Sequence, residues 1–258
     1  MKRQVIILLL MAVVTACSNF IIENSTQEKE QDEQITETPE PSEPSEPEIA
    51  TLESSLYAKV VYGNVDTVKL VWYDRDAKVY IELARGEWKG DGFTMELPET
   101  LDPKYLHPLI GDTGLPPSIP DAPSTLAITN KNVNVANVSF IGVHAKSPLR
   151  TSFYLHEIDE QGNYSPGGLT YITYVDADVS IFGYREDEVL DYLCGYNMLL
   201  DDTPIAPVLW KETRLYSIKW AKGFNVWRFT GWKNCQERTS QEEWTTIPMS
   251  RLRWRAQP

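Results

Sequence analysis

The sequence is poor in residues and motifs that build catalytic or metal centres. It has only three cysteines and three histidines among 258 residues. His107, His144 and His156 form no His-Glu-x-x-His motif, which excludes a zinc protease site of that type. A Gly-x-Ser-x-Gly turn, a phosphate-binding glycine loop and a dinucleotide fingerprint are also absent. We therefore expect a protein that is not an enzyme and carries no cofactor and no metal.

The most apolar stretch is too short to cross a membrane. Residues 5–14 are uninterrupted apolar residues, and ten helical residues cover only about 15 Å, half the hydrocarbon thickness. Lys2 and Arg3 precede this stretch and the small residues Thr15 and Ala16 follow it. This order predicts a signal peptide over residues 1–16.

The four residues Val14-Thr15-Ala16-Cys17 resemble the lipobox of bacterial lipoproteins. The resemblance implies that Cys17 carries a diacylglyceryl group after cleavage, with fatty acyl chains such as palmitate as the anchor. Several acyl chains make anchoring stable, because each buried methylene contributes about 0.8 kcal/mol. Ser18 stands where an aspartate would signal retention in the inner membrane. We expect a lipid anchor in the outer membrane, and the periplasmic and cell-surface faces both stay open.

Residues 17–50 have the composition of a disordered tether after the lipidated cysteine. Residues 18–50 hold ten acidic side chains and one basic one, and four prolines lie between Pro39 and Pro47. Low hydrophobicity with a net charge of −9 predicts disorder, and the proline repeat favours extended conformations. A tether of this kind holds the rest of the chain away from the lipid headgroups.

The charge that remains is ordinary for a folded domain. The net charge of the chain is −13, of which Lys2 and Arg3 contribute +2 and the tether −9, which leaves −6 for residues 51–258. A nucleic-acid partner would require a basic domain surface. We expect no nucleic-acid partner.

The rest of the chain has the period of β-strands. Apolar and polar residues alternate within residues 68–72, 79–83 and 93–97, with the turn residues Asp74-Arg75-Asp76 and Gly90-Asp91-Gly92 between them. A proline-rich stretch, residues 112–123, then interrupts the pattern. The pattern continues in residues 138–143, 151–155, 169–175, 179–182, 215–220, 225–229 and 252–254.

These features predict a mainly β chain with two antiparallel β-sandwich domains, Ig-like or jelly-roll-like. The smaller domain covers residues 51–115 and the larger one covers residues 122–258. Residues 186–194 form the one candidate helix, which Gly195 would end.

Four segments resemble those of uncharacterised lipoproteins from Bacteroidetes. They are residues 82–88, 90–106, 223–227 and 243–247, within a resemblance that covers most of residues 55–258. The resemblance implies a secreted, β-rich module. It carries no known catalytic motif and therefore implies no active site.

Cys194 and Cys235 are the two cysteines besides Cys17. In an oxidising compartment they are candidates for a disulfide that closes a loop of about 40 residues and stabilises the fold by roughly 3 to 4 kcal/mol. Two independent thiols are the alternative.

The C-terminal segment combines tryptophan with basic residues. Residues 211–258 hold ten basic and four acidic side chains. Tryptophans beside arginines suit stacking on sugar rings, whereas strand alternation also allows the tryptophans to pack in a core. The candidate ligand platform consists of Trp220, Trp227, Trp232, Trp244, Trp254, Arg228 and Arg253.

We therefore expect a membrane-anchored, noncatalytic binding or interaction module for a glycan or an envelope protein. One alternative is a structural or assembly subunit of a surface complex, whose strand edges pair with a neighbour. A second is a hydrolase whose carboxylates only folding brings together, because such pairs leave no local motif.

Overall fold

The computed structural model describes residues 49–61, 65–111, 119, 125–159, 161–164, 169–191 and 208–257. The signal peptide, Cys17, the tether up to residue 48 and Cys194 lie outside these residues. The described residues form fourteen strands and two 3-10 helices, Pro103–Tyr105 and Met249–Arg251. The strands are β1 (Ser55–Val61), β2 (Thr67–Asp74), β3 (Val79–Trp88), β4 (Gly92–Glu96), β5 (His107–Pro108), β6 (Ala127–Ile128), β7 (Asn134–His144), β8 (Ser147–Glu157), β9 (Leu169–Val175), β10 (Val179–Asp191), β11 (Val208–Trp220), β12 (Gly223–Asn234), β13 (Thr239–Thr246) and β14 (Leu252–Gln257).

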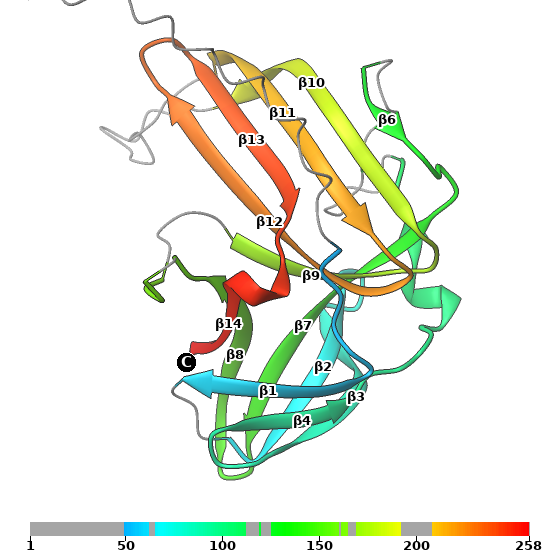
Figure 1. Ribbon diagram of the computed structural model, residues 1–258, viewed down its shortest axis with the longest axis vertical. Coiled ribbons are helices and arrows are strands. Elements are labelled where there is room, and N and C mark those ends of the chain that lie inside the picture. The colour runs from blue at the N-terminus through cyan, green and yellow to red at the C-terminus, as the bar shows by residue number, and fades with distance from the viewer. Residues whose placement is uncertain are drawn as a thin grey trace, which may run out of the picture. The chain divides into compact units, whose positions relative to one another are not determined.

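One continuous sheet contains all of these strands, and half of them close into a barrel. Its order is β2-β3-β4-β1-β14-β8-β7, and β7 pairs with β2 to complete the ring. From β7 the sheet continues as β9-β12-β13-β11-β10-β6. Figure 1 shows the barrel strands in the lower part of the view and β10–β13 above them. Neighbouring strands are antiparallel except for β1–β14 and β11–β13, which are parallel.

The mainly β fold is confirmed, whereas the predicted pair of sandwiches is not. Strands from both sides of the proline-rich stretch share the barrel: β2 pairs with β7, and β1 pairs with β14. The described residues all belong to one compact unit, Ser45–Pro258. Local alternation gave the strands but not their partners, since pairing between distant strands leaves no pattern in the sequence.

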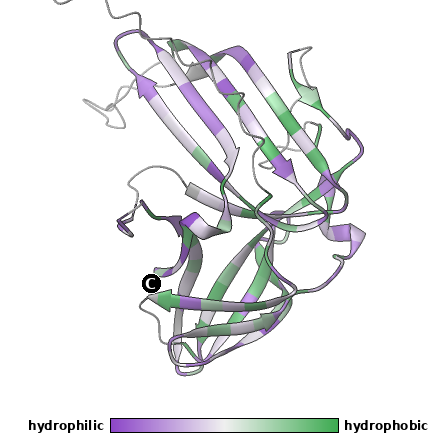
Figure 2. Cartoon of the chain, viewed as in Figure 1, coloured by the Kyte–Doolittle hydropathy of each residue, from purple (hydrophilic) through white to green (hydrophobic). Residues whose placement is uncertain are grey.

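Two hydrophobic clusters lie on the sheet. The first fills the barrel, with Phe93, Phe140, Phe153 and Trp254 among its rings. The second is formed by β9–β12 and the start of β7 together with Leu109, Ile119 and Leu126, and it contains Trp220 and Trp227. Apolar and polar residues alternate along the strands in Figure 2, as expected when one face of each strand is buried.

The predicted helix over residues 186–194 is wrong for residues 186–191, and residues 192–194 lie outside the described residues. Residues 186–191 continue β10, in register with β11 from Glu186↔Thr213 to Asp191↔Val208. The helix propensity of the glutamates is weaker than the pairing of thirteen residues along a neighbouring strand. No helix among the described residues is long and apolar enough to span a bilayer.

Candidate functional site

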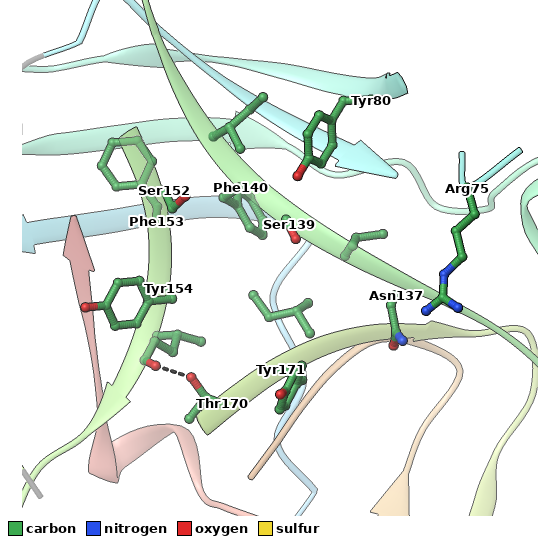
Figure 3. Close-up of a pocket in the computed structure, with 14 residues that line it drawn as sticks. Arg75, Tyr80, Asn137, Ser139, Phe140, Ser152, Phe153, Tyr154, Thr170 and Tyr171 are labelled. Atoms are coloured by element: carbon green, nitrogen blue, oxygen red, sulfur yellow. Dashed lines mark hydrogen bonds between the residues drawn. The ribbon is translucent and has the colours of Figure 1, made fainter. Parts of the chain in front are cut away.

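β7 is the strand at which the sheet divides. Its residues from Phe140 to His144 pair with β8, and its residues from Val135 to Val138 pair with β9 on the same side. β8 then leaves β7 to pair with β14, and β9 leaves it to pair with β12. The divergence leaves a cavity of about 400 Å³ beside Ser139, which we call the fork cavity (Figure 3).

The fork cavity is lined by strands β7, β8 and β9 and by the β2–β3 hairpin. The lining combines aromatic rings with hydroxyl, amide and guanidinium groups. Its residues are Arg75, Tyr80, Asn137, Val138, Ser139, Phe140, Ile141, Ser152, Phe153, Tyr154, Leu155, Thr170, Tyr171 and Ile172.

Tyr80 forms the exposed aromatic rim of the cavity. Its ring packs on Tyr73, its direct partner across the β2–β3 pair, with the centroids 5.0 Å apart. The Arg150 guanidinium lies 5.4 Å from the centroid of the Tyr80 ring. The Tyr80 side chain keeps 49% of its surface exposed, so the ring is supported from two sides and still presents an open face to a ligand.

Tyr171 and Asn137 are held by side chains of the second cluster. Tyr171 stacks on Trp227 with centroids 4.6 Å apart and an interplanar angle of 17°, and burial raises the pKa of its phenol. The indole Nε1 of Trp227 donates to Thr173 Oγ1 at 2.9 Å, and Thr173 donates to Asn137 Oδ1 at 2.7 Å. The Asn137 amide oxygen accepts the hydrogen bond from Thr173, and the nitrogen of the same amide carries two N–H donors.

The two arms of the fork are joined at their open end. Thr170 on β9 donates its hydroxyl to the carbonyl oxygen of Leu155 on β8, as the dashed line in Figure 3 shows. Tyr154, next along β8, packs against His156 with centroids 6.1 Å apart. The cavity is therefore bounded by groups that neighbouring strands hold in place.

The lining of the fork cavity supplies groups that can bind a ligand. The described residues that line the cavity include no Asp, Glu, His or Cys. Glycoside hydrolysis in its common form needs two carboxyl groups on either side of the scissile bond. The fork cavity offers hydrogen-bond donors, acceptors and ring faces, which can hold a ligand.

A second polar cluster lies on β10, β11 and β13. Arg214 pairs with Glu212, with Glu242 at 3.1 Å and with Asp187 at 3.8 Å, while Arg185 pairs with Asp187. Burial raises the pKa of Glu212, with the nearby carboxylates adding to the effect and Arg214 opposing it. Each acid here has an arginine partner, so this is a network of ion pairs within the sheet.

The structure does not bring the predicted tryptophan platform together. Trp220 and Trp227 are buried in the second cluster, where Trp244 stacks on Trp227. Trp254 is 6% exposed inside the barrel, and Trp232 on β12 is 52% exposed. Side chains alternate between the two faces of a strand, and Trp220, Trp227 and Trp254 point into the hydrophobic clusters. The five tryptophans therefore cannot form one exposed surface.

The two arginines of that platform are also engaged elsewhere. Arg228 donates to the buried carboxylate of Glu157 at 2.5 Å. Arg253 donates to the carbonyl oxygens of Ser250 and Leu252 at 3.1 and 2.7 Å. Both guanidinium groups therefore hold parts of the fold together.

Cys235 is disulfide-bonded. Its partner lies outside the described residues, so the pairing with Cys194 stays a prediction. Lipidation of Cys17 also stays a prediction, because this residue is outside them as well.

Asp74, at the end of β2, and Asp176, directly after β9, each accept two hydrogen bonds. Asp74 Oδ1 accepts from the backbone N–H groups of Asp76 and Ala77 at 3.0 and 2.9 Å. The carboxylate of Asp176 accepts from the backbone and amide nitrogens of Asn134 at 2.8 and 2.7 Å. No group of three or more potential metal ligands occurs in the part of the chain that the structure describes.

Sequence reasoning missed Tyr80, Tyr154, Tyr171 and Asn137. Each occupies a strand position where a polar or aromatic side chain is unremarkable. The pairing of β7 with β2 and with both β8 and β9 brings them together, and the sequence does not carry these pairings.

No protein-family model, curated protein or solved structure matches the chain.

Proposed function

We propose that this protein is a membrane-anchored, extracytoplasmic lipoprotein whose folded part is a noncatalytic binding module for carbohydrate. Cys17 is the anchor, residues 18–50 are the tether, and the fork cavity is the binding site. The outer membrane is the proposed location.

The lining of the fork cavity carries this proposal. A sugar presents C–H faces that pack on aromatic rings and hydroxyl groups that need both donors and acceptors. Tyr80 and Tyr171 offer rings, and Asn137, Ser139, Ser152 and Thr170 offer amide and hydroxyl groups. Binding sites for small ligands commonly combine such an apolar surface with a few polar groups.

The experiment is a glycan array followed by titration calorimetry with the full chain in detergent. We expect Tyr80→Ala to weaken binding of an array hit by about tenfold, which is the loss of roughly 1.4 kcal/mol. Tyr57→Ala is the matched control, because Tyr57 is 54% exposed on β1, which pairs with β4 and β14 and is not among the strands that line the cavity. Its binding should equal that of the wild type.

Two results would contradict the proposal. One is an array without a hit together with release of reducing sugar from a polysaccharide panel, which would favour the hydrolase alternative. The other is equal loss of binding in the Tyr80 and Tyr57 variants.

The anchor has its own test. Metabolic labelling with radioactive palmitate should label the wild-type chain, and Cys17→Ser should abolish both the label and sedimentation with outer-membrane vesicles. Unchanged labelling of the variant would contradict the proposed anchor without bearing on the binding site.

A further inference from the structure

We infer that the outer face of β1, β14 and β8 docks on a lipid bilayer that carries anionic headgroups; this inference rests on the proposed lipid anchor. The three strands are neighbours in the barrel, with β14 between β1 and β8 (Figure 1). We call this surface the basic face. It is formed by the side chains of Lys59, His156, Tyr164, Arg253 and Arg255.

The register of the three strands places the cations of the basic face on one surface. Arg255 is the direct partner of Tyr154 on β8 and of Val61 on β1. Arg253 precedes Arg255 by two residues, and Lys59 precedes Val61 by two residues. Direct partners share a face of a sheet, and so do residues two apart on one strand. The three cations therefore project from the same side of the barrel wall.

That side is the outer one. Val60 and Trp254, which alternate with the cations along β1 and β14, are buried in the cluster that fills the barrel. Lys59 and Arg253 are exposed, and Arg255 is half-buried. The cations are therefore open to a partner outside the barrel.

The contacts of the two arginines orient them without removing their charge. Nη1 of Arg253 donates to the carbonyl oxygens of Ser250 and Leu252 at 3.1 and 2.7 Å, and both acceptors are neutral. The Arg255 guanidinium lies 4.6 Å from the centroid of the Tyr164 ring. A guanidinium stacked on a ring keeps its N–H edge available for an anion.

Aromatic rings lie beside the cations. His156 packs on Tyr154 and on Tyr164, with centroids 6.1 and 5.0 Å apart, and Tyr164 is 36% exposed. Tyrosine has an apolar ring and a polar tip, which suit the interface between water and lipid. Tyr154 also lines the fork cavity, so a docked barrel would hold that cavity at the membrane surface.

The charge of the basic face is opposite to that of the folded part as a whole. Residues 51–258 carry a net charge of −6, whereas three bases project together here. Each lysine or arginine near an anionic membrane favours binding about fivefold, so three favour it on the order of a hundredfold. An anionic bilayer would therefore attract this face and repel the rest of the surface, which orients the barrel.

The membrane is also the partner within reach of this face. The composition of the tether predicts a flexible chain, which at that length spans roughly 30 Å. Such a tether can hold the barrel off the bilayer and also let it return. A partner joined through a flexible linker acts at an effective concentration of about millimolar, so even weak docking is populated. A soluble polyanion lacks this advantage.

The test measures the exposure of Lys59 in the lipidated full chain reconstituted into liposomes. The liposomes consist of phosphatidylcholine alone or of an equal mixture of phosphatidylcholine and phosphatidylglycerol. Amine acetylation with peptide mass spectrometry gives the labelling rate of each lysine, and the exposed Lys222, between β11 and β12, is the internal reference. We expect labelling of Lys59 relative to Lys222 to fall about tenfold or more in the anionic liposomes. High salt should reverse the fall, because it screens the charges.

Matched double variants assign the docking to the basic face. R253Q/R255Q keeps Lys59 as the reporter and should weaken docking about twenty-fivefold, which restores most of the labelling. K131Q/R238Q removes the same charge at two exposed turn positions and should behave as the wild type. R253K/R255K keeps the charge and should dock as the wild type does. Thermal unfolding shows whether each variant is folded.

Each other outcome overturns the inference. Equal relative labelling of Lys59 in both kinds of liposome would leave the anchor and the fork cavity standing and make the docking wrong. Equal restoration of labelling in R253Q/R255Q and K131Q/R238Q would assign the docking to net charge alone. Protection of Lys59 by added polygalacturonate, but not by anionic lipid, would assign the face to a soluble polyanion. A chain that remains with neither kind of liposome would overturn the proposed anchor itself.

Discussion

Trp254 and Phe140 meet edge to face inside the barrel, with ring centroids 5.0 Å apart and an interplanar angle of 76°. The two residues lie on β14 and β7, which do not pair with each other but both pair with β8. Phe93 on β4 packs against both rings at 5.4 and 5.7 Å. The centre of the barrel is therefore an aromatic cluster that joins strands from widely separated parts of the chain.

Replacing Trp254 by alanine should destabilise the fold strongly. Removal of a buried tryptophan loses its transfer free energy and leaves a void, which together cost about 3–5 kcal/mol. The free energy of unfolding in guanidinium chloride measures the effect. Trp232→Ala, at the exposed tryptophan, is the control and should stay within about 0.5 kcal/mol of the wild type. Similar losses in both variants would contradict the structure.

Gly142 allows β7 to approach a neighbouring side chain. A Cβ atom at this position would lie 2.7 Å from Cε2 of Phe153 and 2.6 Å from Cγ1 of Val65. Gly142→Ala should therefore cost about 1–3 kcal/mol through overpacking. Gly231→Ala is the control, because a Cβ there meets its nearest neighbour, Phe229, at 3.4 Å. Thermal unfolding should separate the two variants clearly, and equal melting temperatures would refute the close approach at Gly142.

Glu157 is a buried carboxylate, 3% exposed, between Arg228 and Arg251. Glu157→Ala should cost about 3–5 kcal/mol, because it leaves the partly buried Arg228 without its counter-ion. Glu186→Ala breaks the exposed pair with Lys211 and should cost under about 1 kcal/mol.

A double variant separates the attraction between Glu157 and Arg228 from the cost of burying their charges. Glu157→Leu with Arg228→Met should recover much of the loss seen in Glu157→Ala, because neither charge then remains in the interior. Urea unfolding of all the variants measures these differences. A double variant no more stable than Glu157→Ala would show that the packing around the pair dominates.

The ion pairs of Glu82 should make stability depend on pH in the acid range. Hydrogen bonds from Arg85 and Lys69 lower the pKa of Glu82 from its ordinary value of 4.5 to about 2. A lowered carboxyl pKa stabilises the folded state above pH 4.5, and this contribution is lost as the pH falls from about 4.5 to about 2.

Glu82→Gln provides the measurement. Because the pair is partly exposed, the substitution should cost under about 1 kcal/mol at pH 7. The difference from the wild type should disappear near pH 2. A difference that is independent of pH would show that the carboxylate charge is not responsible.

The sequence predicts the strands well because half-buried strands repeat every two residues. The alternation at Val68 and Leu70 and the turn at Asp74 both appear in the structure. Core packing, which alternation allowed as the alternative to a ligand platform, is found for Trp220, Trp227 and Trp254. These are local properties, which a single segment of sequence can specify.

The barrel and the fork cavity could not be predicted in this way. They depend on which strands pair, as in Leu70↔Phe140 and Val60↔Trp254, and such partners are chosen by the total fit of the core. β1 was missed although Leu56, Ala58 and Val60 alternate with exposed residues, whereas β13 is polar at every position except Trp244 and carries no such alternation. Residues 186–191 were predicted to be helical but form a strand, because a local helical preference is weaker than pairing along a long neighbouring strand.

The parallel pairing of β1 and β14 determines when the barrel can fold during synthesis. The ring closes through Val60 and Trp254, and Val60 leaves the ribosome long before Trp254. A nascent chain that has not yet reached residue 252 has every other barrel strand but cannot complete the ring. Folding must then wait for a contact of very long sequence separation, which slows it.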